Sequence, residues 1–209
     1  MARDEIDRFN QWAQTYERHP MQRFIFGPVH VTALQLAADE VPRPAAILDV
    51  GCGTGRLLRS AALRFPGAEL VGVDAAIEMV KQAKASFPSG VGIRFQQATA
   101  EHLPLQNAGF DLVFSTLTFH HWIDQRRGIA DGPGAGTGGR WLLADFIPSE
   151  VIRYVSRLLG LKQFQDRERL EEMLSDEGLA VLTERPVAGL GGQLPVLAIG
   201  APARISLNT

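Results

Sequence analysis

The chain has 209 residues, of which 45% are hydrophobic and 21% are charged, and its formal net charge is −2. This composition is typical of a globular domain, and the near balance of charge gives no footprint for nucleic acid or an anionic membrane surface. The single cysteine, Cys52, excludes an internal disulfide and a metal cage built from cysteines. We expect one cytoplasmic domain over residues 1–209, without a leader or a membrane span, and no bound metal.

Two helices are predicted before the first strand. Over residues 4–18, apolar side chains recur at steps of three and four among charged ones, which indicates an amphipathic helix. This helix should end before Pro20, because the residue before a proline avoids the helical region. A second helix is predicted over 28–40. We expect both, within residues 1–44, to form N-terminal cap helices over a ligand pocket.

From Ile47 onward, strands and helices alternate, which predicts a parallel, doubly wound α/β sheet. The predicted strands cover 47–50, 69–73, 92–96, 110–115, 140–145, 180–185 and 194–200. The predicted helices cover 55–65, 76–86, 149–160 and 166–178. A short Gly-rich link joins the last two strands, so these should form an antiparallel hairpin at the sheet edge. We therefore predict a mostly parallel, seven-stranded sheet, with a cofactor-binding core at 45–145, a helical segment at 146–180 near an acceptor pocket, and an edge hairpin and tail at 181–209.

The most informative segment is Ile47–Gly55, in which a strand containing Asp49 leads into a glycine-alternating turn. Glycines let the backbone approach a ligand closely, because no Cβ intervenes. The spacing is Gly-x-Gly-x-Gly, and Arg56 stands where the Gly-x-Gly-x-x-Gly turn of nicotinamide and flavin sites has its third glycine. This pattern favours a nucleoside cofactor without a diphosphate.

The loop Asp49–Gly55 resembles the cofactor loop of the class I S-adenosylmethionine-dependent methyltransferases. The most similar branch is the small-molecule group related to the quinone-biosynthesis C-methyltransferases. The similarity runs from about Phe9 to about Ala198 and includes a Trp-Ala-x-x-Tyr segment ending at Tyr16. It implies a Rossmann-like methyltransferase fold, S-adenosyl-L-methionine as cofactor and methyl transfer to a small-molecule acceptor. The alternative is a protein that binds this cofactor without turnover, in a regulatory or scaffold role.

The resemblance also implies a set of cofactor contacts. Asp49 can accept hydrogen bonds from the cofactor's ammonium group, and backbone groups of the loop can serve its carboxylate and sugar. Asp74, at the end of the second predicted strand, can accept both ribose hydroxyls or act as the N-cap of the next helix. The candidate cofactor-binding residues are Asp49, Gly51, Cys52, Gly53, Asp74, Ala75, Met79, Thr99, Ala100 and Ser115.

One of these candidates departs from the family's pattern. Residues 97–104 resemble a Gly-Asp-Ala-Glu-x-Leu-Pro segment, but Thr99 replaces the aspartate that meets the adenine amine. A hydroxyl accepts a hydrogen bond without charge, so this contact should be weaker. The backbone N–H of Ala100 remains able to serve a ring nitrogen, and Met79 either packs on the adenine or belongs to the core.

Transfer of a methyl group from a sulfonium is an in-line displacement that depends mainly on placement of the acceptor. His120 and His121 follow the fourth predicted strand, where the resembled family lines its acceptor pocket. Either can act as a base, since the ordinary pKa of histidine is about 6.5, or simply form the pocket wall. O-, N- and C-methylation stay open, although no Asn-Pro-Pro-Tyr-like segment favours a nucleobase or amide nitrogen.

Residues 131–139 are unusually rich in glycine where the resembled family carries a helix. Each glycine costs about 1 kcal/mol in a helix relative to alanine, so no helix is expected here. Two interpretations stand. The segment is a natural loop, or it results from a local frameshift restored before Arg140, because its codons read one base out of frame can give Ala-Arg-Val-Leu-Ala-Pro-Gly.

Overall fold

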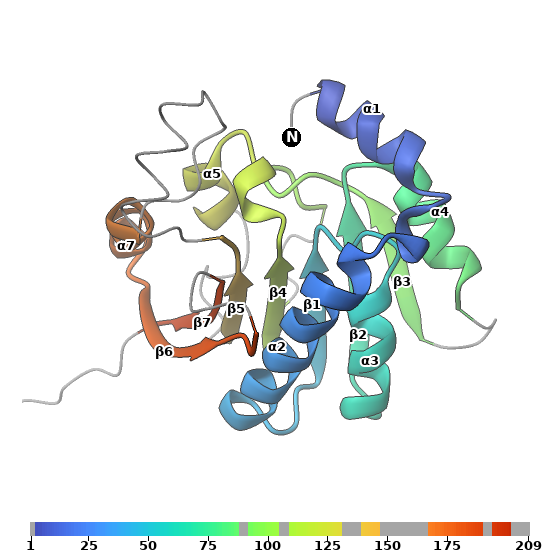
Figure 1. The fold of residues 1–209 in the computed structure, drawn as a ribbon. Helices are drawn as coiled ribbons and strands as arrows, with labels where there is room; N and C mark the ends of the chain where they lie inside the picture. The colour runs from blue at the N-terminus through green and yellow to red at the C-terminus, as the bar shows by residue number, and fades with distance from the viewer. Residues whose placement is uncertain are drawn as a thin grey trace, which may run out of the picture.

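The computed structural model describes residues 3–87, 92–104, 109–130, 139–146, 167–189 and 194–201. Its strands are β1 (Ala46–Val50), β2 (Glu69–Asp74), β3 (Ile93–Gln97), β4 (Leu112–Thr116), β5 (Arg140–Ala144), β6 (Ala180–Pro186) and β7 (Pro195–Gly200). They form one seven-stranded sheet in the order β3-β2-β1-β4-β5-β7-β6 (Figure 1). The pairs among β1 to β5 are parallel, and β7 is antiparallel to both β5 and β6. The predicted fold class and edge hairpin are thus confirmed.

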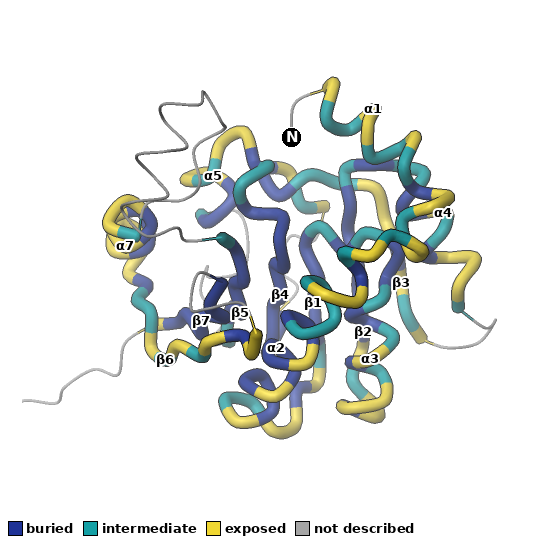
Figure 2. Tube along the Cα trace, viewed as in Figure 1, coloured by how far each residue is buried: buried dark blue, intermediate teal, exposed yellow. Residues whose placement is uncertain are grey.

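Helices cover both faces of the sheet. The longer ones are α1 (Arg3–Trp12), α2 (Gly27–Glu40), α3 (Arg56–Arg64), α4 (Ile77–Ala85), α5 (Gln125–Ala130) and α7 (Arg167–Asp176). Side chains of α2, α3 and α4 share one apolar cluster with the sheet, whereas those of α5 and α7 share the cluster on the opposite face. Figure 2 shows the strands buried between these layers, with exposed residues on the outer sides of the helices.

Strand composition explains the burial. Each residue of β4 is buried, as expected for a parallel strand covered on both faces. Along β4 the side chains alternate: Phe114 joins the cluster under α2 and α3, and Val113 joins the cluster under α7. Trp141 of β5 lies on the same side as Val113 and is 1% exposed. The apolar run therefore supplies two cores at once.

The predicted N-terminal helix over 4–18 is wrong in length. Helix α1 ends at Trp12, whose carbonyl accepts hydrogen bonds from both the backbone N and the Oγ1 of Thr15. A 3₁₀ turn, η1 (Tyr16–Arg18), follows, and His19 before the proline is extended as expected. The side chain of Thr15 thus stops the helix by competing for its carbonyls.

The second predicted helix also has a different role from the one expected. A π-helical turn, η2 (Gln22–Phe26), runs directly into α2, and α2 packs on β4, β5 and β7 rather than serving only as a cap. We call residues 3–26 the cap, because these precede α2 and lie over the carboxyl ends of the strands (Figure 1). The predicted helix over 149–160 lies outside the described residues, as do positions 131–138.

No helix in the described part of the chain combines the length and apolar character needed to cross a membrane. The loops that follow β1, β2 and β4 lie together at the carboxyl ends of these strands. Open parallel sheets bind their ligands at the carboxyl ends of the strands.

Candidate functional site

The turn after β1 requires glycine at two positions. Gly51 has a φ of +79°, and a Cβ there would lie 2.2 Å from Thr118 Oγ1. Gly55 has a φ of +77°, and its Cβ would lie 2.8 Å from the ring of Phe95. Both positions combine a left-handed backbone with no room for a side chain. The glycine pattern therefore brings this turn against β3 and the segment after β4.

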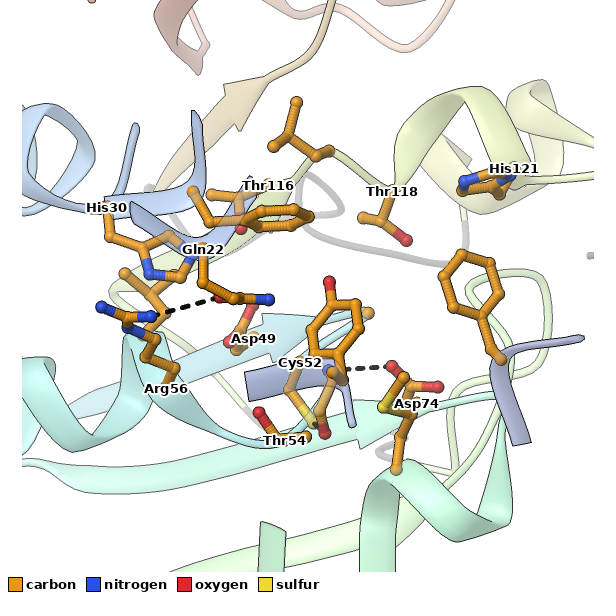
Figure 3. A pocket seen from close by; sticks show the side chains of 18 residues that line it. Gln22, His30, Asp49, Cys52, Thr54, Arg56, Asp74, Thr116, Thr118 and His121 are labelled. Atoms are coloured by element: carbon orange, nitrogen blue, oxygen red, sulfur yellow. Dashed lines mark hydrogen bonds between the residues drawn. The ribbon is translucent and has the colours of Figure 1, made fainter. Parts of the chain in front are cut away.

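A hollow lies at the carboxyl ends of β1, β2 and β4 and encloses about 570 Å³, its open mouth included (Figure 3). This main hollow is lined by Phe9, Tyr16, Gln22, Phe26, His30, Asp49, Gly51, Cys52, Gly53, Thr54, Arg56, Leu57, Asp74, Met79, Thr116, Leu117, Thr118 and His121. A side hollow of about 320 Å³ is lined by Val50, Gly51, Asp74, Ala75, Ala98, Thr99, Ala100, Glu101, Thr118 and Trp122. The two share Gly51, Asp74 and Thr118, so they adjoin.

Nearly all the predicted cofactor residues meet in these two hollows. Those that line the main hollow are Asp49, Gly51, Cys52, Gly53, Asp74 and Met79, and those that line the side hollow are Gly51, Asp74, Ala75, Thr99 and Ala100. Ser115 lines neither. It is fully buried, and its Oγ accepts a hydrogen bond of 3.1 Å from Trp141 Nε1. Thr116, the next residue of the strand, lines the main hollow instead.

Asp49 is one of three residues of the main hollow with a buried polar atom that lacks a hydrogen-bond partner among the described residues, the others being Gln22 and His121. Asp49 is 1% exposed, and its Oδ1 has no hydrogen-bond partner among the described residues. Burial, followed by the charge of Asp74, raises the pKa of Asp49 to about 8. A buried acceptor without a donor costs about 1–3 kcal/mol. A cationic donor in the hollow would remove that cost and return the carboxyl to its charged form.

Asp74 holds the loop and faces both hollows. Its Oδ2 accepts from the Gly53 N–H at 2.9 Å, and its Oδ1 accepts from the Ala76 N–H at 2.8 Å, just before α4. Burial raises the pKa of Asp74 to about 6, although these two amide donors act in the opposite direction. A carboxylate has about four acceptor sites, so two remain for a ligand. The turn-forming and ligand-binding roles are thus compatible.

The amides of the glycine turn are already used within the fold. The N–H groups of Gly51 and Cys52 donate to the Val73 carbonyl at 2.8 and 3.0 Å, and the Gly53 N–H donates to Asp74. The expectation that these amides are available to a ligand carboxylate is therefore not supported. Cys52 is buried, and burial together with the nearby carboxylates raises the pKa of its thiol well above the usual value. It is a packing residue in this structure.

Side-chain hydrogen bonds connect the cap to the glycine turn. The Glu17 carboxylate accepts from Thr54 Oγ1 and, at 2.7 Å, from Arg59 Nη2, and Arg59 Nη1 also donates to the Thr54 carbonyl at 2.9 Å. Burial would raise the pKa of Glu17, but the hydrogen bonds from Thr54 and Arg59 outweigh it and lower that pKa. The aromatic ring of Tyr16 packs edge-to-face on Trp12, with 4.9 Å between centroids.

The two histidines occupy different environments. His121 lines the main hollow, where burial and then the nearby His120 lower its pKa to about 4. Glu5 Oε1 lies 3.5 Å from its Nδ1, which is long for a hydrogen bond. His120 lines neither hollow, and its Nδ1 lies 2.8 Å from Oδ1 of the buried Asp145. The two rings are tilted against each other by 43°, with 3.9 Å between their centroids.

Comparison with known proteins identifies the domain. Residues 47–131 match the family model described as a methyltransferase domain, which begins at β1 and includes both candidate carboxylates and both histidines. Residues 47–131 therefore form a methyltransferase domain, and the chain is similar in sequence to known methyltransferases.

Relatives of this methyltransferase include enzymes of two kinds. It is 42% identical over 106 residues to a malonyl-[acyl-carrier protein] O-methyltransferase of Geobacter sulfurreducens, covering 47% of this chain and 39% of that one. It is 33% identical over 118 residues to a demethylmenaquinone methyltransferase of Thermus thermophilus, covering 56% of this chain and 53% of the relative. The chain thus spans roughly two fifths to one half of the length of these two relatives.

The fold of this methyltransferase is also found among solved structures. The magnesium protoporphyrin IX methyltransferase of Synechocystis PCC 6803, solved with bound S-adenosylhomocysteine, superposes with a TM-score of 0.72. The alignment covers 94% of this chain and 97% of that one at 18% identity. At this identity the likeness establishes the fold and nothing finer.

Sequence reasoning missed the part of the site that the cap and α2 supply. Gln22 and His30 are both buried and line the main hollow, and Arg56, noted only as a break in a glycine pattern, lines it as well. No motif marks them, but a histidine on the mostly apolar buried face of α2 is a signal that could have been followed. Within the described ranges, no three His, Cys, Asp or Glu side chains converge as a metal site.

Proposed function

We propose that this methyltransferase transfers the methyl group of S-adenosyl-L-methionine to a small-molecule acceptor. The observation that carries the proposal is the unpaired, buried oxygen of Asp49 in a hollow that also contains Asp74 and the glycine turn. Such a site favours a ligand with a cationic end and a ribose. The relatives named above act on malonyl-[acyl-carrier protein] and demethylmenaquinone, and the second of these names supports a small-molecule acceptor.

The residues present fit this cofactor. Asp49 would receive its ammonium group, and Asp74 would receive its ribose hydroxyls through the two acceptor sites that the backbone leaves open. The side hollow, with Ala75, Thr99 and Ala100, would hold the base. The bound cofactor supplies an electrophilic methyl group on a sulfonium. The protein's own task is to place the acceptor in line with it and to exclude water.

We further propose that His121 is the base wherever the acceptor must lose a proton. Its lowered pKa keeps the imidazole neutral at physiological pH, so one ring nitrogen can accept a proton within the main hollow. His120 would act as a positioning residue. Its ring is fixed by the buried Asp145, which also accepts from the His120 and Phe146 backbone N–H groups at 2.9 and 2.8 Å.

Calorimetry tests the cofactor assignment. The protein should bind S-adenosylhomocysteine and should not bind NAD. Binding of NAD without S-adenosylhomocysteine would contradict the proposal. Methyl-transfer assays with a panel of acyl thioester, quinol, phenol and carboxylic acid acceptors then test turnover, and product formation with one of these classes excludes the non-catalytic alternative.

Substitution of the histidines tests the proposed base. His121→Asn should lower kcat by about 10²–10⁴-fold and leave the affinity for S-adenosylhomocysteine unchanged. The exposed His102 offers a control, since His102→Asn should change neither quantity. A His121→Asn enzyme with normal kcat over the whole pH range would restrict His121 to the pocket wall.

A further inference from the structure

One side of the main hollow contains polar side chains to which the proposed function assigns no role. Gln22 comes from η2, His30 from α2 and Arg56 from the start of α3, and Figure 3 shows the three gathered on one side of Asp49, with Asp74 on the other side. All three line the hollow. Three segments separated in the sequence therefore converge on one small region beside the unpaired carboxyl.

Gln22 presents a hydrogen-bond donor without an acceptor. The residue is 4% exposed, and its Oε1 accepts a long hydrogen bond of 3.4 Å from Arg56 Nη1. Its Nε2 has no hydrogen-bond partner among the described residues. Burial and then the charge of Asp74 raise the pKa of the neighbouring Tyr16 hydroxyl, and the nearby Gln22 side chain acts in the opposite direction. A buried amide nitrogen in this state requires an acceptor from a ligand.

Arg56 gives this region a positive charge. In the described part of the chain, no carboxylate lies within ion-pair distance of its guanidinium. His30 adds no charge of its own at neutral pH, because burial and then the charge of Arg56 lower its pKa to about 4. The region therefore offers a cation and an unpaired N–H donor, which together match an anion.

Asp49 is available for a cationic group of the same ligand. Asp49 and Arg56 form no ion pair with each other, so each is left for a ligand group of opposite charge. The N–H groups of Gly51, Cys52 and Gly53 already donate to Val73 and Asp74, so these three amides are not available to a carboxylate. An α-amino acid carries a cation and an anion on the same carbon, and this arrangement of charges is complementary to it.

We propose that Gln22 and Arg56 bind the α-carboxylate of the cofactor's amino-acid moiety, beside Asp49 and its ammonium group. This inference rests on the proposed function, since it assigns one end of that cofactor. It makes the cap a part of the cofactor site, because Gln22 belongs to η2. Cofactor with an intact carboxylate should therefore hold the cap closed, and cofactor without it should not.

The test compares two ligands that differ in one group. Calorimetry is performed with S-adenosylhomocysteine and with its decarboxylated analogue, S-adenosyl-3-thiopropylamine, which keeps the amine. The wild-type protein should bind the analogue at least about tenfold more weakly. Arg56→Gln should weaken S-adenosylhomocysteine by about tenfold or more and leave the analogue within about twofold of wild type. Gln22→Leu should act in the same direction with a smaller effect.

Controls make the outcomes distinct. Arg64→Gln removes the same charge from the exposed end of α3 and should leave both affinities unchanged. Unchanged binding of the analogue to Arg56→Gln also shows that the variant is folded. Equal weakening of both ligands, or of neither, would overturn the carboxylate assignment. If the wild-type protein binds neither ligand, the proposed function itself fails.

Discussion

The floor and the cap of the main hollow are built in different ways. The floor, which consists of β1, residues 51–55 and the start of α3, is held by backbone hydrogen bonds, including those from Gly51 and Cys52 to Val73 and from Gly55 to Cys52. The cap is held by side chains, through the hydrogen bonds of Glu17 to the glycine turn and through apolar packing of α1 on the start of α4. The difference indicates that the floor is a rigid part of the sheet, whereas opening of the cap would break side-chain contacts and expose a small apolar cluster without breaking the sheet.

The largest expected effect comes from a change in the floor. Gly51→Ala imposes a left-handed backbone on a residue with a Cβ, which costs about 1–2 kcal/mol, and forces that Cβ against Thr118, which costs about 1–3 kcal/mol more. The free energy of unfolding, measured by urea denaturation, should fall by roughly 2–5 kcal/mol.

Gly67→Ala is the matched control for this prediction. Gly67 also has a positive φ, +92°, but nothing lies within 4 Å of its Cβ position. Only the conformational cost of about 1–2 kcal/mol should therefore be observed. Equal losses for the two variants would mean that Thr118 moves aside at no cost and that the added Cβ brings only the backbone strain.

A smaller effect is expected when the charge of the floor is removed. Asp49→Asn keeps the shape of the side chain but deletes the carboxylate that would receive the ammonium group. The affinity for S-adenosylhomocysteine should fall by about 10- to 100-fold, as measured by calorimetry. Asp39→Asn, at an exposed position near the end of α2, should leave the affinity unchanged.

The same variant should change the pH dependence of stability. Asp49 has a pKa of about 8 in the folded protein, against 3.8 ordinarily. Below about pH 4, both the folded and the unfolded chain hold the proton. As the pH rises from there to about 8, the unfolded chain alone gives up the proton, so the free energy of unfolding falls. Asp74, with a pKa of about 6, acts in the same direction. In Asp49→Asn, the free energy of unfolding should therefore fall less steeply between about pH 4 and pH 8. A pH profile identical to that of the wild-type protein would contradict the raised pKa of Asp49.

The smallest effect is expected in the cap. Glu17→Gln removes the charge that binds Thr54 and Arg59, and a loss of about 1 kcal/mol would lower the affinity for S-adenosylhomocysteine by roughly fivefold. Hydrogen exchange of residues 3–26 should become faster while exchange in β1 stays slow. Glu69→Gln breaks an exposed ion pair with Arg94 at the sheet edge and should change neither measurement. Faster exchange in β1 would show that cap and floor open together.

The floor was predictable from the sequence because its requirements are local. The glycine turn follows β1 directly, and β2 pairs with β1 in parallel. Asp74 is the last residue of β2, so it lies next to the turn. Strand positions and sheet type were therefore predicted correctly, and Asp49 and Asp74 both line the main hollow, where their roles toward a ligand stay predictions. Local reasoning should also have excluded the Ser115 side chain, because alternation along β4 places it with Val113 and Trp141, and Thr116 toward the hollow.

The cap was less predictable because tertiary contacts decide its shape. The periodicity of residues 4–18 is helical throughout, yet Thr15 ends the helix at Trp12 by bonding to its carbonyl. No pattern in the local sequence predicts the π-helical turn η2, which positions Gln22 in the hollow. Its place depends on how α2 packs on the sheet, and the same dependence applies to His30.

Gly139 has a consequence for the gene. A Cβ at this position would lie 2.4 Å from the Phe110 carbonyl oxygen, directly before β5 pairs with β4 through Arg140 and Leu112. No other amino acid fits there without moving one of the two central strands. Codon 139 is therefore the latest point at which a displaced reading frame could return and still encode this sheet, and DNA comparison among close strains should show invariant glycine there even where the preceding codons differ.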